Sequence, residues 1–172
     1  MSENLEQQMQ EYTNKYYKKN KKNSLFKTSQ KFDCAKEMSN HFSNETLLQS
    51  NIYIIPNSNF IYIDYPLVKQ FLCPDNYDNI SRHILTLNQE ILKTHPYFNI
   101  RVDLKSFTIT AAQRYGDLIR KFCSLYLDAT EQSAKIEKIQ IVNPPSVMKV
   151  LLKLFSPFIS QESLNKVQFI TP

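Results

Sequence analysis

The sequence predicts an α/β fold in which covering helices and one unusually apolar helix pack on a mostly parallel sheet. Short β-branched and aromatic runs alternate along the chain with segments whose apolar residues recur every three or four positions. This alternation favours parallel strands, because each connecting helix carries the chain back across the sheet. The 172 residues suffice for one domain with a modest extension.

The first two strands are predicted at residues 52–55 and 60–63, which are rich in isoleucine, tyrosine and phenylalanine. The Pro-Asn-Ser-Asn sequence at residues 56–59 separates them. These four residue types favour tight turns, so the segment predicts a turn between two strands.

The middle of the chain supplies a helix, a strand and a second helix. Apolar residues at intervals of four, three and four predict a helix over residues 80–91. Strict alternation of apolar and polar residues predicts a strand over residues 98–104. Residues 115–126 have one apolar face, as does a helix that covers a sheet, and we expect this face to be ordinary core.

The last third of the sequence predicts strands at residues 139–142 and 167–170, with a helix at residues 147–155 between them. Asn-Pro-Pro at residues 143–145 ends the earlier strand, because proline cannot continue a hydrogen-bonded ladder. The apolar side chains of the helix cover an arc of about 200°, wider than one sheet can bury. A second element, an apolar ligand in a cavity, or a membrane or protein partner would account for this excess.

Composition argues against an enzyme. A single glycine, Gly116, excludes the glycine-rich loops that bind nucleotide phosphates. Three histidines and three cysteines without ligand spacing predict no metal or other cofactor. Asp64 and Asp103 end predicted strands, but no histidine or serine accompanies them at a recognisable spacing, so we expect structural roles.

The cysteines and the hydropathy pattern bear on location. Cys34, Cys73 and Cys123 have no pairing pattern, which indicates free thiols in a reducing compartment. No apolar run approaches the roughly 18 residues of a membrane span, and the N-terminus lacks the apolar segment of a signal peptide. We therefore expect an intracellular protein, with the cytoplasm favoured and the mitochondrion as the alternative.

Residues 1–48 are rich in Asn, Gln, Lys and Ser, and they predict a flexible, solvated basic arm ahead of a folded domain at residues 49–172. Residues 11–31 hold seven lysines against one glutamate, whereas the whole chain carries a net charge of only +5. The arm is a candidate contact for an anionic membrane or a larger protein assembly, and nucleic acid is the least favoured partner. The candidate contact residues are Lys15, Lys18, Lys19, Lys21 and Lys22.

Residues 136–170 resemble the C-terminal half of CRAL-TRIO domains. The resemblance lies in the strand ending in Asn143-Pro144-Pro145, the apolar helix after it, the Ser-Pro-Phe sequence at residues 156–158 and the Glu-Ser-Leu turn at residues 162–164. Less sharply, residues 98–104 resemble the central strand of that family.

This resemblance implies an α/β module that encloses a lipid or another hydrophobic molecule beneath a gate helix, without chemistry. Some members act instead as scaffolds, so the alternative is an accessory subunit that uses the fold for protein interaction in a large assembly, for example a mitochondrial or ciliary one. Six side chains of this segment correspond to the gate: Val147, Val150, Leu151, Leu154, Phe155 and Phe158.

Overall fold

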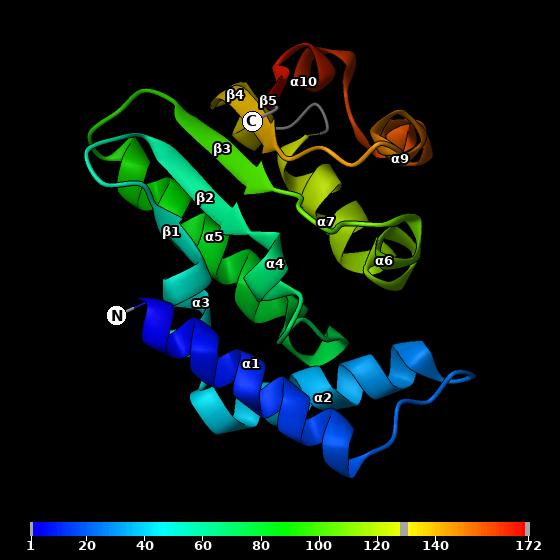
Figure 1. Cartoon of the computed structure of the whole chain (residues 1–172). Helices are drawn as coiled ribbons and strands as arrows, with labels where there is room; N and C mark the ends of the chain where they lie inside the picture. Colours follow the sequence, from blue (N-terminus) through cyan, green and yellow to red (C-terminus); the bar gives the residue numbers. More distant parts are fainter. Residues whose placement is uncertain (1, 128–130, 171–172) are drawn as a thin grey trace.

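A five-stranded sheet organises the computed structural model of the chain, which describes residues 2–127 and 131–170 (Figure 1). The strands lie in sequence order across the sheet. The first pair is antiparallel and the other three pairs are parallel. The predicted α/β fold with a mostly parallel sheet is confirmed. The strands are β1 (Ile52–Ile54), β2 (Phe60–Asp64), β3 (Phe98–Asp103), β4 (Ile136–Val142) and β5 (Val167–Ile170).

The turn between β1 and β2 closes a hairpin where the sequence predicts one. The N–H of Ile55 donates to the carbonyl of Phe60 at 2.9 Å. Asn57 takes a left-handed backbone conformation with φ of 57°, which asparagine adopts more readily than most residues. The hairpin sets the register in which Ile52 faces Ile63.

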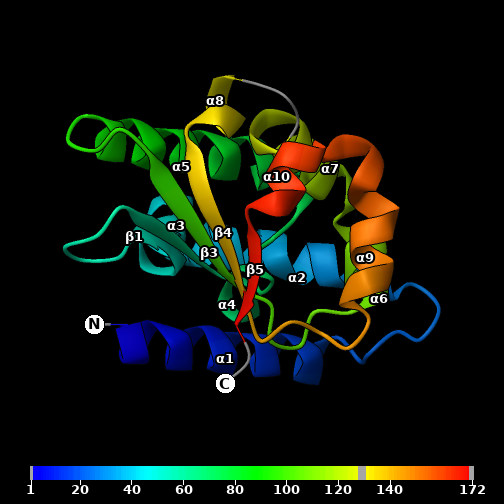
Figure 2. The ribbon, with the colours of Figure 1, turned by 90° about the horizontal axis from the view of Figure 1, so that it is seen from above.

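The helices after β2 include the three predicted ones, at α5, α7 and α9. Short helices, including the 3₁₀ turns η1 and η2, fill the connections between them. Figure 2 shows α5 and α7 along one side of the strands. These elements are α4 (Tyr65–Val68), η1 (Pro74–Asn76), α5 (Tyr77–Leu92), α6 (Ile109–Arg114), α7 (Gly116–Tyr126), α8 (Glu131–Ala134), α9 (Met148–Phe155), η2 (Ser156–Phe158) and α10 (Gln161–Asn165).

The two faces of the sheet differ in chemistry. On the helix-covered face, Ile61 and Ile100 are almost completely buried. On the other face a row of larger polar and aromatic side chains crosses the strands, and no described helix lies in front of β2 and β3 in Figure 1. Within this row the Nε of Arg101 donates to Gln140 at 2.8 Å. Apolar side chains therefore face one layer of helices, as in a two-layer α/β fold.

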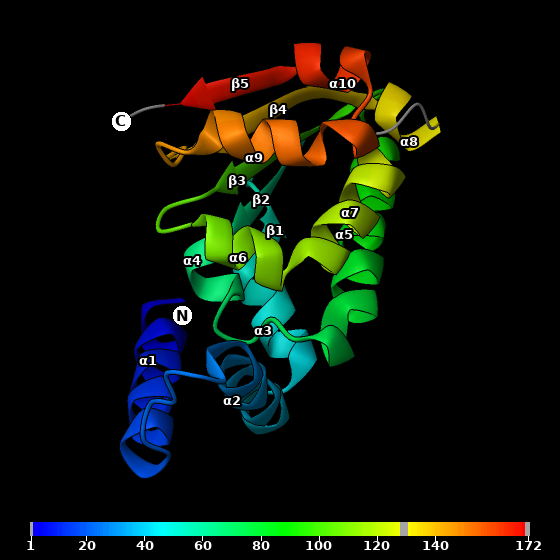
Figure 3. The same cartoon turned by 90° about the vertical axis from the view of Figure 1, so that its right-hand side faces the viewer.

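The expectation of a flexible arm over residues 1–48 is wrong. These residues form α1 (Ser2–Lys19), α2 (Lys27–Phe42) and most of α3 (Asn44–Asn51), which lie at the β1 side of the molecule, far from β5 (Figure 3). Met9 and Met38 are fully buried in the main core cluster. Glu, Gln and Lys favour helices, so a polar composition is compatible with an ordered helical layer. The division of the chain at residue 48 stays a prediction, and the core runs across it, since Leu47 and Ile52 belong to one cluster.

Candidate functional site

Helix α9 has two chemically different stripes. Its inner stripe recurs at intervals of three, one and three residues, which places these side chains on one side at about 100° per residue. The outer stripe is exposed and alternates lysines with aliphatic residues, so Val150 and Leu154 are 56% and 50% exposed. The inner stripe is Met148, Leu151, Leu152 and Phe155, and the outer one is Lys149, Val150, Lys153 and Leu154.

A cavity of about 250 Å³ lies between the inner stripe of α9 and the sheet. Its floor is a rung of four paired residues from four neighbouring strands: Ile52, Ile63, Val102 and Ile141. Because inward side chains alternate along each strand, a single register places all four at the same level. The inner stripe of α9 therefore faces this space, whereas Val150 and Leu154, which widen its apolar arc, lie on the exposed outer stripe.

Helices α5 and α7 supply the remaining long walls of the cavity. Ile80 and Ile84 face it from α5, while Leu118, Ile119 and Phe122 face it from α7. The expectation that the apolar face of residues 115–126 is ordinary core therefore needs correction. Tyr126 is fully buried and Cys123 nearly so, but the cavity-facing Leu118, Ile119 and Phe122 are only partly buried. Periodicity identifies the buried face of a helix but cannot distinguish a packed neighbour from a space.

The cavity wall is almost entirely apolar. Ser81 is one of the described lining residues with a polar side chain. Its hydroxyl donates to the carbonyl of Tyr77 at 3.0 Å. Cys123 also lines the cavity, and burial raises the pKa of its thiol to about 12, so the thiol is neutral at physiological pH. This apolar, uncharged wall suits hydrocarbon and disfavours a buried charged headgroup.

The six predicted gate residues separate into three pairs. Leu151 and Phe155 are buried and line the cavity. Val150 and Leu154 point outward, because they lie on the other stripe of α9, and they do not line it. Val147 and Phe158 pack against the core at the two ends of the helical segment. Met148 and Leu152 line the cavity but were not predicted, although their spacing from Leu151 and Phe155 in the sequence is a detectable signal.

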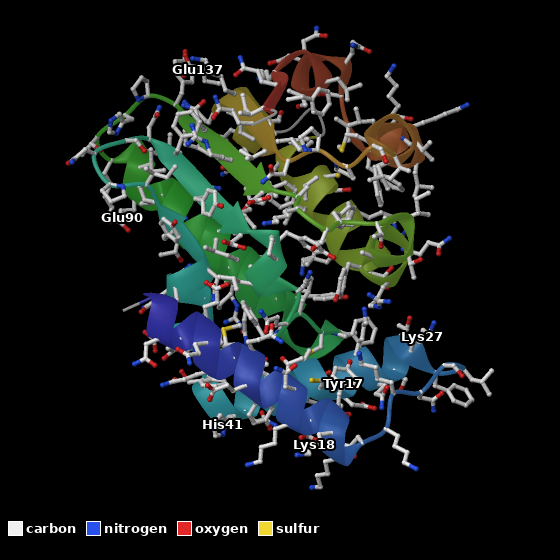
Figure 4. All side chains as sticks on the ribbon, in the orientation of Figure 1. Tyr17, Lys18, Lys27, His41, Glu90 and Glu137 are labelled. Carbon is white, nitrogen blue, oxygen red and sulfur yellow. The ribbon has the colours of Figure 1, made fainter. Side chains whose placement is uncertain are left out.

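The five predicted contact lysines lie together near the end of α1. Lys15, Lys18 and Lys19 are exposed on the helix, and Lys21 and Lys22 follow in the loop before α2. The ammonium of Lys22 lies 5.7 Å from the centre of the Tyr17 ring. Figure 4 shows Lys18 on the outer side of α1, away from the sheet. Their role in membrane or partner contact stays a prediction.

The two strand-end aspartates have structural partners. One carboxylate oxygen of Asp64 accepts from the N–H of Leu67 at 3.1 Å and caps α4. Asp103 accepts from the N–H of Lys105 at 2.7 Å and from the side-chain amide of Asn143 at 3.0 Å. Asn143, with φ of 51°, thus connects the end of β4 to the end of β3 and positions the chain that leads into α9.

Within residues 2–127 and 131–170, no three His, Cys, Asp or Glu side chains are grouped as metal ligands would be. In the same residues, no helix combines the length and the hydropathy needed to cross a membrane.

The family model of the CRAL/TRIO domain matches residues 84–172, just over half of the chain. The chain belongs to the CRAL/TRIO family. Its members bind lipids and other hydrophobic ligands, are typically non-catalytic and are generally intracellular. A search among curated proteins finds no match. The matched segment contains β3, β4, β5, α7 and α9, and it therefore supplies much of the cavity wall, while the N-terminal helices and the hairpin lie outside it.

Proposed function

We propose that this CRAL/TRIO chain binds one hydrophobic molecule in the cavity beneath α9 and does no chemistry on it. The observation that carries the proposal is the cavity itself, which is hollow and apolar where interiors are normally close-packed. The pocket opens to solvent, so its apolar lining meets water, which is unfavourable. A bound hydrocarbon removes this apolar surface from water.

The volume limits the ligand class. Ligand pockets commonly measure about 300 to 1,000 Å³, and an apolar cavity of about 150 Å³ suffices for benzene. A cavity of about 250 Å³ thus suits one compact apolar molecule or one hydrocarbon chain, and not both chains of a phospholipid. Each buried methylene contributes about 0.8 kcal/mol, so a single chain can supply useful affinity.

In this proposal α9 is the gate and its outer stripe is a membrane contact. Exposed Val150 and Leu154 beside Lys149 and Lys153 match an interfacial amphipathic helix, whose apolar side chains enter the lipid while its lysines meet anionic headgroups. The exposed lysines near the end of α1 add positive charge that favours the same kind of membrane.

A matched pair of substitutions on α9 tests the proposal. Leu151→Asp places a carboxylate on the cavity wall, whereas Leu154→Asp places the same group on the outer stripe. We expect Leu151→Asp to abolish uptake of a fluorescent fatty-acid analogue presented in dilute solution, because a charge in an apolar cavity is strongly unfavourable. We expect Leu154→Asp to retain uptake in solution and to lose transfer from anionic vesicles.

Leu152→Ser keeps the test decisive if Leu151→Asp fails to fold, since Leu152 is only partly buried and the substitution adds no charge. It should weaken uptake without loss of the helical circular dichroism signal. Equal uptake by the wild type and all three variants would contradict the proposal. A chain that binds no analogue but purifies with a protein complex would favour the scaffold alternative.

A further inference from the structure

The chain closes the β1 edge of its sheet with its own side chains and backbone. The N–H of Ile52 donates to the carbonyl of Leu48 in α3, and the carbonyl oxygen of Ile52 lies 2.8 Å from Nε2 of His83 on α5. A carbonyl can only accept, so His83 donates this hydrogen bond. β1 is also only three residues long. Short edge strands with occupied backbone groups resist pairing with another chain.

The opposite edge, formed by β5, is built differently. Figure 3 shows β5 at the outer margin of the sheet, next to β4. The carbonyls of Lys166 and Ile170 accept from N–H groups on the β4 side at 2.9 and 3.2 Å. Backbone groups alternate in direction along a strand, so those of Gln168 also point to β4, whereas those of Val167 and Phe169 point outward. Within residues 2–127 and 131–170, these outward N–H and C=O groups have no hydrogen-bond partner.

The side chains of β5 do not protect this edge either. Its sequence, Val-Gln-Phe-Ile, contains no charge and no proline. Phe169 and Ile170 are 48% and 39% exposed. The charge nearest in sequence, on Lys166, is balanced because its ammonium lies 2.7 Å from the carboxylate of Glu162. Edge strands commonly carry lysine or proline that prevents pairing, so an uncharged edge with exposed apolar side chains indicates a docking strand.

We propose that two copies of this chain associate through β5 into one continuous sheet, with Gln168 on the twofold axis. Strands related by such an axis run antiparallel. With Gln168 facing its own copy, Val167 of each copy faces Phe169 of the other. Each outward N–H of one copy then meets an outward C=O of the other, because directly opposite residues of this kind exchange both hydrogen bonds. This register uses the described residues of β5 alone.

The side chains of β5 also match their own copy across the axis. Val167 and Phe169 lie on the helix-covered face, so each opposed pair joins a β-branched and an aromatic side chain, which is a favourable cross-strand combination. On the other face, the Oε1 of Gln168 accepts from the amide of Gln140 at 3.3 Å. The amide of Gln168 can therefore donate across the axis to its copy and continue this polar row. Since β5 is uncharged, no like charges of the two strands oppose each other, and a neutral copy of the strand fits better than a charged partner.

Sedimentation velocity of the full chain measures this association. An interface made by two short strands is small, and small interfaces are usually weak and reversible. Over concentrations from about 1 to 500 µM, we therefore expect the weight-average mass to rise toward twice the mass of the polypeptide. The mass of a single polypeptide at every concentration would overturn the proposal and would leave the β5 edge to an extended segment of another protein.

Phe169→Pro tests the backbone pairing. Proline removes an N–H that points away from β4, so the β4–β5 ladder should persist, while each copy loses a hydrogen bond across the axis. We expect the dissociation constant of the dimer to rise about tenfold or more, with the helical circular dichroism signal unchanged. Tyr97→Ala removes an aromatic side chain that is also 48% exposed but lies before β3, and it should change the constant less than about threefold. Equal effects of the two variants would contradict association through β5.

Charged substitutions at Gln168 test the register. Gln168→Lys places two ammonium groups against each other on the axis, and Gln168→Glu does the same with two carboxylates, so each variant alone should dimerise about tenfold more weakly than the wild type. An equimolar mixture of the two should regain the dimer, because unlike charges then face each other. This recovery is specific to a residue that faces its own copy. A mixture that associates no better than either variant alone would overturn the proposal, and this holds even if Phe169→Pro fails to fold.

Discussion

Two regions on the helix-covered side of the sheet are built differently. Where α2, α3 and the segment before α5 meet, the interior is filled: Met38, Leu47 and Phe71 are fully buried. The side-chain amide of Asn76 crosses this region and donates to the carbonyl of Phe71 at 2.5 Å and to the hydroxyl of Ser39 at 3.3 Å.

Beneath α9, in contrast, the walls are equally apolar but surround an open pocket of about 250 Å³. The filled region contains the tight contacts that stabilise the fold, and in the proposed function the region beneath α9 leaves its contacts to a ligand. In that proposal, similar side chains serve stability in one place and binding in the other.

The largest expected effect on stability comes from the filled region. Phe71→Ala should lower the free energy of unfolding by about 3 to 5 kcal/mol, because it creates a void in close-packed surroundings. Phe155→Ala removes the same atoms from a wall that already faces a space, so its cost in the ligand-free chain should be clearly smaller. Urea unfolding of both variants measures the difference, and equal losses would abolish the distinction between the two regions.

A smaller effect of opposite sign is expected from filling the cavity. Ile119→Phe adds volume from α7 toward the hollow space, and it should raise the free energy of unfolding of the ligand-free chain by about 0.5 to 2 kcal/mol. The same substitution should reduce uptake of the fatty-acid analogue. Leu154→Phe is the matched control on the outer stripe, where the change should stay within about 0.5 kcal/mol. Destabilisation by Ile119→Phe together with unchanged uptake would indicate a filled interior.

Much of the sheet and of the principal helices could be predicted, because β-branched runs and helical spacing reflect burial on one face. The excess apolar arc of α9 also predicted that something other than the sheet must face it. The N-terminal helices could not be predicted from composition, since their buried positions use methionine, alanine and cysteine among many polar residues. The spacing of Leu5, Met9, Tyr12 and Tyr16, at four, three and four, is the signal that indicates α1.

The candidate site could be predicted only in part. Helical spacing places Leu151 and Phe155 on one side of α9. Which side of α9 faces the sheet depends on the chain before the helix, which the hydrogen bond from Asn143 to Asp103 positions. This is why Val150 and Leu154 were expected inside and lie outside.

Native mass spectrometry of the full chain, purified without added lipid or detergent, tests the central claim most directly. The proposal predicts a population of the protein that carries one additional small apolar molecule, which organic extraction releases and which Ile119→Phe lacks. A single species at the mass of the polypeptide, which also fails to take up a fatty-acid analogue from solution, would contradict a ligand site beneath α9.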